Sequence, residues 1–580
     1  MFKRFQGYRW PQFGADALAG GIAAVIMIPQ AMAYAILAGL PPEYGLYGCL
    51  APLVLYGMFG GSTSLSVGPV ALIALLVYSG VSPLAPPGSP QFIALCGTLA
   101  LMSGTIKVVM ALFRMGFMTN FISFPVLVGF TNAAAIIIVL SQLKHWIGIS
   151  IEHGEYPIEW IWATLINFSH ANRFALGMGM TSCAILWLVA VWQKTNKDHR
   201  DRFVVGLWLA KLAPMLVVAV AALWVLLARL DQSVEIRVIG DIPRGLPGWS
   251  WPSMDLASLK ALLPVAVAVA LVGYVQSMSV AQALAIRKRE RVDPNRELFA
   301  LGMADVGAAV TQGFPVTGSF SVSTIRDAAG SQTPVSSIMT AAAVALAVIW
   351  LTPWFYFIPQ AVLASIVMVS VVTIIDWRTP LRLWRYSRND AFTLWFTFLA
   401  VIVIGVEWGI VVGIAATFVS WLWRTSRPQI IEVGRIPGRQ TFRNVQRYRV
   451  EQVPGVFAIR MDESLYFANA RYLHEFVLRQ LAERPDLRAV LLIASGVNRI
   501  DATGIEVLKL LIDDLNRAGV LFVMSDVKWA VTNRLQRSDL SPEFLQNSVF
   551  LTPEEALQFV RQELGESSPD ADAAPVTAKE

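Results

Sequence analysis

Long apolar runs separated by short polar links make up almost all of the chain from residue 14 to residue 424. Most runs contain close to 20 residues, the length that an α-helix needs to cross a hydrocarbon core of about 30 Å. We therefore expect transmembrane helices near residues 14–38, 42–60, 91–113, 121–147, 174–193, 203–229, 257–286, 296–313, 333–352, 358–375, 389–406 and 407–424.

Two further apolar segments, 66–80 and 317–328, are too short or too interrupted to be ordinary spanning helices. The first follows a polar lead with a Gly-Pro pair, and the second begins within the hydroxyl-rich stretch FPVTGSFSVST. Each is the third element of a seven-segment half of the chain. Irregular backbone cannot face lipid, so matched interruptions in two halves of a transporter indicate a binding site. We expect half-helices near 68–80 and 320–330.

A half-helix that begins inside the membrane leaves its first N–H groups unpaired and carries about half a positive charge at that end. Such ends bind anions. Pro69 suits the start of the first half-helix, and Ser321 and Ser323 add hydroxyl donors at the second. Two converging ends predict a site for one small anion. The structural alternative is a kink in which Ser or Thr bonds back to a helix carbonyl.

Composition agrees with a polytopic membrane protein, because 55% of residues are hydrophobic and only 15% are charged. Soluble domains carry about 25% charged residues. The most basic links, 193–202, 286–297 and 376–390, should be cytoplasmic, and with fourteen segments both termini then lie on that side. No basic run interleaved with aromatic residues occurs in the soluble part, so we expect no nucleic-acid partner.

The sequence offers no residues for an enzyme or a metal site. The three cysteines lie in apolar runs without ligand spacing, and the five histidines are scattered. Walker A, HExxH, GxSxG and paired-carboxylate motifs are all absent. We therefore expect no cofactor, apart from a coupling ion, Na⁺ or H⁺.

The composition becomes that of a soluble domain after about residue 430. Short apolar runs predict strands at 456–461, 489–497, 521–527 and 549–552. Helical patterns at 470–483 and 504–519 lie between them, which predicts an α/β sheet domain over 440–564. The tail 565–580 lacks apolar periodicity and should be disordered, and residues 1–13 form a short basic, cytoplasmic start.

Several stretches resemble the sulfate permease (SulP) family of anion transporters, whose animal members include prestin and pendrin. The matching stretches are IPQAMAYAILAGLPPEYGLYG (28–48), SLSVGPVALIALL (64–76), DPNRELFALGMADV (293–306) and FPVTGSFSVS (314–323). The soluble part is similar to a STAS domain through LYFANARYL (465–473) and IDATGIEVL (500–508).

The resemblance implies fourteen transmembrane segments in a seven-plus-seven inverted repeat, with a core domain that moves against a gate domain. It also implies a homodimer in a bacterial plasma membrane, a cytoplasmic STAS domain that can bind a protein partner, and an anion between the third and tenth segments. Secondary active sulfate transport by alternating access is the expected function. Transport or exchange of bicarbonate, chloride or a dicarboxylate, an uncoupled channel, and a STAS-linked sensor remain alternatives.

The resemblance also implies which residues face the anion. These are Gln30, Tyr34, Val70, Ala71, Ser319, Phe320, Ser321, Val322 and Ser323. Taken alone, Gln30 also fits a helix-packing glutamine and Tyr34 an aromatic filler.

The chain departs from the family pattern at two positions. Val322 stands where many members carry Arg, and Gln276 stands where many carry a carboxylate. Losing both charges keeps the site electrically balanced, but Gln276 cannot carry a proton. Asp305 is then the best remaining intramembrane carboxylate and a candidate for coupling, or else a buried acid paired with a neighbouring helix. Lys107 is expected near the end of its span.

In the soluble domain, DATG (501–504) opens a predicted helix. Related bacterial domains are phosphorylated at a hydroxyl there, which makes Thr503 a regulatory candidate. The simpler interpretation, which we favour, is that Asp501 caps the helix.

Overall fold

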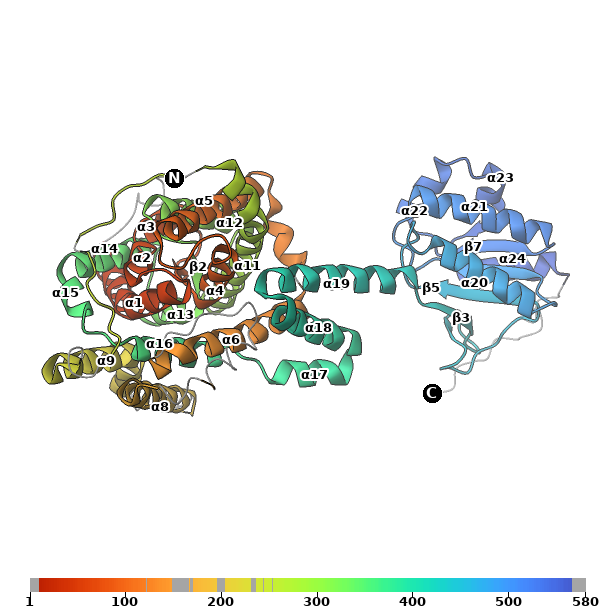
Figure 1. Cartoon of the computed structure of the whole chain (residues 1–580). Coiled ribbons are helices and arrows are strands. Elements are labelled where there is room, and N and C mark those ends of the chain that lie inside the picture. Colours follow the sequence, from red (N-terminus) through yellow and green to blue (C-terminus); the bar gives the residue numbers. More distant parts are fainter. Residues whose placement is uncertain are drawn as a thin grey trace. The chain divides into compact units, whose positions relative to one another are not determined.

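The computed structural model describes residues 10–121, 123–148, 166, 171–195, 204–230, 236–243, 245–252 and 254–565. Most of the expected cytoplasmic start and nearly all of the expected disordered tail lie outside these residues. The chain divides into two compact units, Met1–Thr417 and Phe418–Glu580, and each is described by itself (Figure 1).

The helices of the first unit confirm most of the predicted spans. They are α1 (Trp10–Leu37), α2 (Pro42–Tyr47), α3 (Ala51–Phe59), α4 (Ala71–Val81), α5 (Pro90–Leu112), α6 (Phe124–Ile147), α8 (Arg173–Thr195), α9 (Val204–Ala228), α11 (Leu256–Lys288), α12 (Pro294–Val310), α13 (Phe320–Ala328), α14 (Val335–Trp350), α16 (Gln360–Val372), α18 (Arg388–Ile404) and α19 (Val406–Ser426). Within the described residues, five of them (α1, α5, α6, α8 and α11) are each long and apolar enough to cross a bilayer.

The span expected at 42–60 is wrong as a single helix, because it is divided into α2 and α3. A Cβ on Gly45 would lie 2.0 Å from the carbonyl oxygen of Ala31, so α2 packs against α1 backbone to backbone. Pro52 then lies in the first turn of α3, where its missing N–H breaks no helix hydrogen bond. Three short elements also occupy expected links: η2 (Met115–Phe121), α15 (Thr352–Phe355) and α17 (Arg378–Tyr386).

The helices pack in two groups. The first group contains α1 to α5 with α11 to α14, and the second contains α6, α8, α9, α16 and α18. Inside the first group, α5 and α12 cross closely. A Cβ on Gly104 would lie 2.8 Å from the carbonyl oxygen of Gly302, so only small residues fit at this crossing. We call the two groups the core and the gate.

A buried two-stranded sheet, which the sequence did not predict, lies among the core helices (Figure 1). Strands β1 (Ser66–Gly68) and β2 (Thr317–Ser319) are antiparallel, with Ser66 opposite Ser319 and Gly68 opposite Thr317. Three residues are too few to show a strand periodicity in the sequence. The pairing satisfies backbone groups that could not otherwise be buried inside a membrane.

The second unit confirms the predicted α/β domain. Its sheet has the order β4-β3-β5-β6-β7-β8. The strands are β3 (Ile430–Arg435), β4 (Phe442–Asn444), β5 (Val456–Met461), β6 (Ala489–Ile493), β7 (Leu521–Ser525) and β8 (Val549–Phe550). The helices are α20 (Ala470–Glu483), α21 (Ala502–Arg517), α22 (Trp529–Gln536), α23 (Pro542–Asn547) and α24 (Pro553–Glu563).

The four predicted strands, β5 to β8, run parallel, and β3 and β4 extend the sheet antiparallel at one edge. Helices α20, α21 and α22 share one apolar cluster on the sheet, while α24 belongs to a separate cluster. Arg484 donates two hydrogen bonds to Glu432 in β3, at 2.9 and 2.8 Å, and these bonds lower the pKa of the Glu432 carboxyl.

Candidate anion-binding site

The two half-helices begin directly after the two paired strands. Val70 caps α4 in an extended conformation, and Ser319 caps α13 in the same way. Each strand of three residues spans about 7 Å, so the pairing brings both helix starts into one small region. The first N–H groups of a helix have no partner within the helix, so this region holds two sets of backbone donors.

Hydroxyl groups hold the strand pair in place. The Ser66 N–H donates to Oγ of Ser323 at 2.8 Å, and the Gly318 N–H donates to Oγ of Ser277 at 2.8 Å. Oγ of Ser277 lies 2.7 Å from Oγ1 of Thr317. Ser323, expected to face the anion, therefore accepts a bond from β1 and is fully buried, so it positions the site.

The accessible part of the second helix tip is small. Phe320 is 55% exposed and Ser321 is also exposed. Ser319 caps the helix, since its Oγ lies 3.5 Å from the N–H of Val322. The Val322 side chain is buried in the apolar cluster of the unit. Of the tip residues 319–323, Phe320 and Ser321 are therefore the accessible ones.

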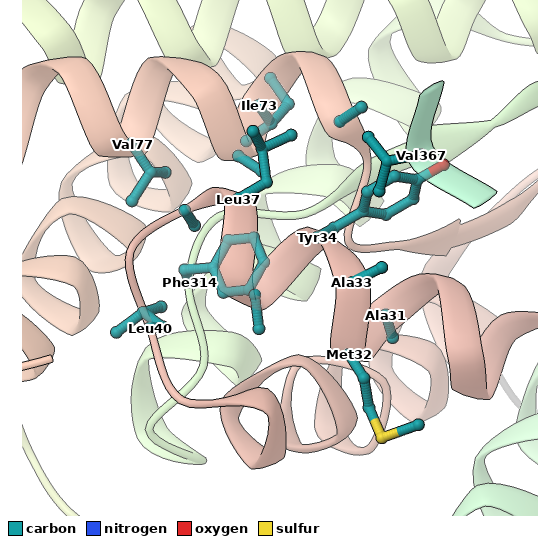
Figure 2. Packing of buried hydrophobic residues seen from close by; sticks show 14 of the residues in the cluster. Ala31, Met32, Ala33, Tyr34, Leu37, Leu40, Ile73, Val77, Phe314 and Val367 are labelled. Atoms are coloured by element: carbon teal, nitrogen blue, oxygen red, sulfur yellow. The ribbon is translucent and has the colours of Figure 1, made fainter. Parts of the chain in front are cut away.

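Gln30 and Tyr34 lie one turn apart on α1, and both are buried. The Tyr34 ring reaches towards Val367 of α16, as Figure 2 shows, while Leu37 and Ile73 lie between α1 and α4. Helix α1 thus contacts the gate at the level of its predicted site residues.

Three buried polar atoms near the strand pair have no hydrogen-bond partner among the described residues. They are Oε1 of Gln276 on α11, Oγ of Ser66 on β1 and Nε of Arg326 on α13. Gln276 adjoins Ser277, which bonds to β2. Leaving a buried polar atom unsatisfied costs about 1–3 kcal/mol, so such atoms indicate a bound ion, ligand or water.

A fully buried ion pair lies between α5 and α12. Nζ of Lys107 is 2.6 Å from Oδ2 of Asp305, and Ser103 donates to the same oxygen at 2.7 Å. The Val316 N–H donates to the other carboxylate oxygen at 2.9 Å. Lys107 does lie towards the end of α5, as expected, but it is fully buried and paired rather than exposed at the membrane interface. In the sequence, the only indication of a buried polar cluster here was the spacing of Ser103 and Lys107, which lie four residues apart on one helix face.

The ion pair lies directly behind the strand pair and the start of α4. A Cβ on Gly273 would be 3.3 Å from Nζ of Lys107, 3.5 Å from Oγ1 of Thr317 and 3.6 Å from Cδ1 of Ile73. Glycine at 273 leaves this space open. All three partners of Asp305 are donors, so both of its carboxylate oxygens accept hydrogen bonds.

Two other buried charges clamp the loop that leads into β1, and the sequence did not reveal either role. Glu297 on α12 accepts bonds from the Tyr56 hydroxyl at 2.8 Å and from two backbone N–H groups of that loop. Arg326 on α13 is fully buried and donates to Ser337 and to the carbonyl of Leu65. Both clamps keep the strand pair fixed to the core.

In the second unit, the structure confirms that Asp501 caps α21. Its carboxylate accepts the N–H of Gly504 at 2.7 Å and the N–H of Phe467 at 2.9 Å. The Thr503 side chain is exposed, and its phosphorylation stays a prediction.

We expect Asp501→Ala to destabilise α21 by about 1–2 kcal/mol, because both backbone donors lose their acceptor. Hydrogen exchange of the α21 amides in the full chain measures this change. Thr503→Ala, the matched control, should alter the same amides by less than about 0.5 kcal/mol. Equal effects of the two substitutions would contradict the capping role.

A membrane unit with two half-helices that start at a buried strand pair is typical of secondary transporters. The Sulfate permease family matches residues 13–397, and the STAS domain matches residues 447–556. The chain therefore belongs to the sulfate permease family and carries a STAS domain.

Known relatives agree with this assignment. The chain is 33% identical to "Probable sulfate transporter 4.2" of Arabidopsis thaliana over 566 residues, which cover 95% of this chain and 82% of the relative. It is similar in fold to the inward-facing structure of murine Solute Carrier 26 family member A9, with a TM-score of 0.87, 23% identity, and coverage of 94% and 91%. The transmembrane domain of the cyanobacterial bicarbonate transporter BicA matches 70% of this chain and 98% of its own length, with a TM-score of 0.57 and 22% identity.

Proposed function

We propose that the chain is a secondary active transporter that binds one inorganic anion, most readily sulfate, between the starts of α4 and α13. The observation that carries this proposal is the buried strand pair, which brings two sets of helix N–H donors together beside the unsatisfied hydroxyl of Ser66. The sulfate transporter named among its relatives supports sulfate as the substrate.

Alternating access follows from the division into core and gate. Asp305, Glu297 and Ser277 accept backbone N–H groups of the strand pair and its flanking loops, and these bonds lie within the core, so the site can move as one body against the gate. The basic links support a cytoplasmic location for both termini and the STAS domain in a multi-pass plasma-membrane protein. A homodimer and a protein partner of the STAS domain belong to the same proposal.

Coupling is assigned to Gln276 rather than to a proton on Asp305. Three donors already occupy the Asp305 carboxylate, which suits a structural ion pair with Lys107. The unpartnered carboxamide oxygen of Gln276 is an acceptor, and an acceptor suits Na⁺ or a proton-bearing anion such as bicarbonate. We therefore propose Na⁺-coupled symport, with H⁺ coupling and anion exchange as the other outcomes of the test.

The test uses the full chain in liposomes with radiolabelled sulfate, bicarbonate, chloride and a dicarboxylate. Uphill accumulation driven by a Na⁺ gradient supports the proposal, and the preferred anion identifies the substrate. Flux that only runs downhill and responds to neither a Na⁺ gradient nor a H⁺ gradient would establish a channel. If no anion moves, transport is the wrong function and the sensor alternative gains support.

We expect Val322→Arg alone to destabilise the protein by about 3–5 kcal/mol, because it places an uncompensated charge in an apolar cluster. Adding Gln276→Glu supplies a carboxylate that the guanidinium can pair with and restores part of that stability. The double variant should also gain sulfate preference and proton dependence.

Thermal unfolding of the detergent-purified protein and sulfate uptake at two pH values measure these effects. Gln276→Glu alone is the matched control. A double variant no more stable than Val322→Arg alone would show that the two positions do not face each other.

A further inference from the structure

Helix α17 (Arg378–Tyr386), which links α16 to α18, has three distinct faces. One face is buried through Pro380 and Leu383, and Leu383 shares a cluster with Leu394 of α18. This face attaches α17 to the gate. The other two faces are exposed, and each has one kind of side chain.

The first exposed face is apolar. Trp377 is 66% exposed, Leu381 71% and Trp384 58%. These residues follow one another at intervals of four and three, which places them on one side of a helix. Large apolar side chains gathered on one exposed face mark an interaction surface, and tryptophan in particular concentrates at the membrane–water interface.

The second exposed face is cationic. Arg378, Arg382 and Arg385 are all exposed, and each follows one residue of the apolar face, so the arginines form a parallel stripe rotated by about 100°. The nearby carboxylate of Asp376 accepts the backbone N–H groups of Arg378 and Thr379 and caps the helix start. Three guanidinium groups along one side present phosphate-binding forks in a row.

We propose that α17 lies in the bilayer interface and binds the phosphate headgroups of anionic phospholipids through the stripe of Arg378, Arg382 and Arg385. The band of Trp377, Leu381 and Trp384 would enter the acyl region beside the headgroups, as in other interfacial helices. The three basic links of the chain place α17 at the cytoplasmic leaflet, where anionic lipids attract basic segments. Because α17 is packed on α18, bound lipid would hold this end of the gate against the membrane.

The experiment uses the detergent-purified full chain, to which phosphatidylglycerol or phosphatidylcholine is added, and counts retained lipids by native mass spectrometry. We expect the protein to retain phosphatidylglycerol at least about tenfold better than phosphatidylcholine. Arg378→Gln/Arg382→Gln/Arg385→Gln should abolish this preference. Because the three substituted arginines are exposed, this variant should fold like the parent protein. The matched control, Arg439→Gln/Arg447→Gln/Arg449→Gln, removes the same charge from the second unit and should keep the preference.

Equal retention of both lipids by the unmodified protein would overturn the proposal, as would an unchanged preference in the triple α17 variant. A triple variant that changes oligomeric state without losing phosphatidylglycerol would instead assign the surface to a second copy of the chain. Flux in vesicles of phosphatidylethanolamine with and without phosphatidylglycerol gives an independent readout. In these vesicles, the triple α17 variant should show none of the increase in flux that phosphatidylglycerol gives the unmodified protein.

Discussion

Asp305→Asn should tighten anion binding, whereas Lys107→Met should weaken it. Each substitution leaves one charge of the buried pair uncompensated, and that charge lies directly behind the proposed site. A unit charge about 10 Å away, at an effective dielectric constant of about 20, contributes roughly 1.7 kcal/mol, or more than a factor of 10 in affinity. Divalent sulfate should respond more than chloride.

Both single variants should also lose about 3–5 kcal/mol of stability, because a buried charge without its partner is costly. The double variant Lys107→Met/Asp305→Asn removes both charges, so its loss should be well below the sum of the single losses. Sulfate and chloride titrations followed by calorimetry measure affinity, and thermal unfolding of the same samples measures stability.

The two single substitutions should change anion affinity in opposite directions, and this difference makes the experiment decisive. A pair that only holds α5 against α12 would make both single variants bind anions more weakly. Such a result would contradict an electrostatic role for Lys107 at the site while leaving the transport proposal intact, since that proposal is tested by flux of the unmodified protein.

Phe320→Pro should lower anion affinity by about 10- to 100-fold, because it removes one backbone N–H from the second helix tip. A hydrogen bond to a charged group contributes about 1.5–3 kcal/mol. Phe320 is the first residue of α13, where proline is favoured, and Ser319 before it is already extended, as a residue preceding proline must be. The exposed Phe320 side chain leaves room for the ring.

Phe320→Ala is the matched control, since it also removes the aromatic ring but keeps the N–H. Sulfate uptake and calorimetric affinity of the two variants isolate the contribution of that single donor. If the two variants bind sulfate equally well, the start of α13 is not part of the anion site. Thermal unfolding should show both variants close to the parent protein, because the helix geometry is preserved.

The apolar run lengths were sufficient to predict the spans, the two half-helices and the sheet domain, because these features depend on local composition and spacing. The sequence also predicted an anion site at the starts of α4 and α13, and this stays a prediction. It did not reveal that the Ser323 hydroxyl accepts a bond from β1, since its partner Ser66 is 257 residues away. The division of the expected span at 42–60 likewise depends on the contact of Gly45 with Ala31.

The sequence by itself determined that this protein is a membrane transporter of the sulfate permease family, because hydrophobic length and motif residues are properties of contiguous segments. Only the tertiary structure decided the electrostatics of the site. Lys107 and Asp305 are 198 residues apart, and their charges meet only because small residues let α5 and α12 cross closely. That crossing places a cation behind the proposed anion site, whose own helix carries Val322, and no local pattern encodes this arrangement.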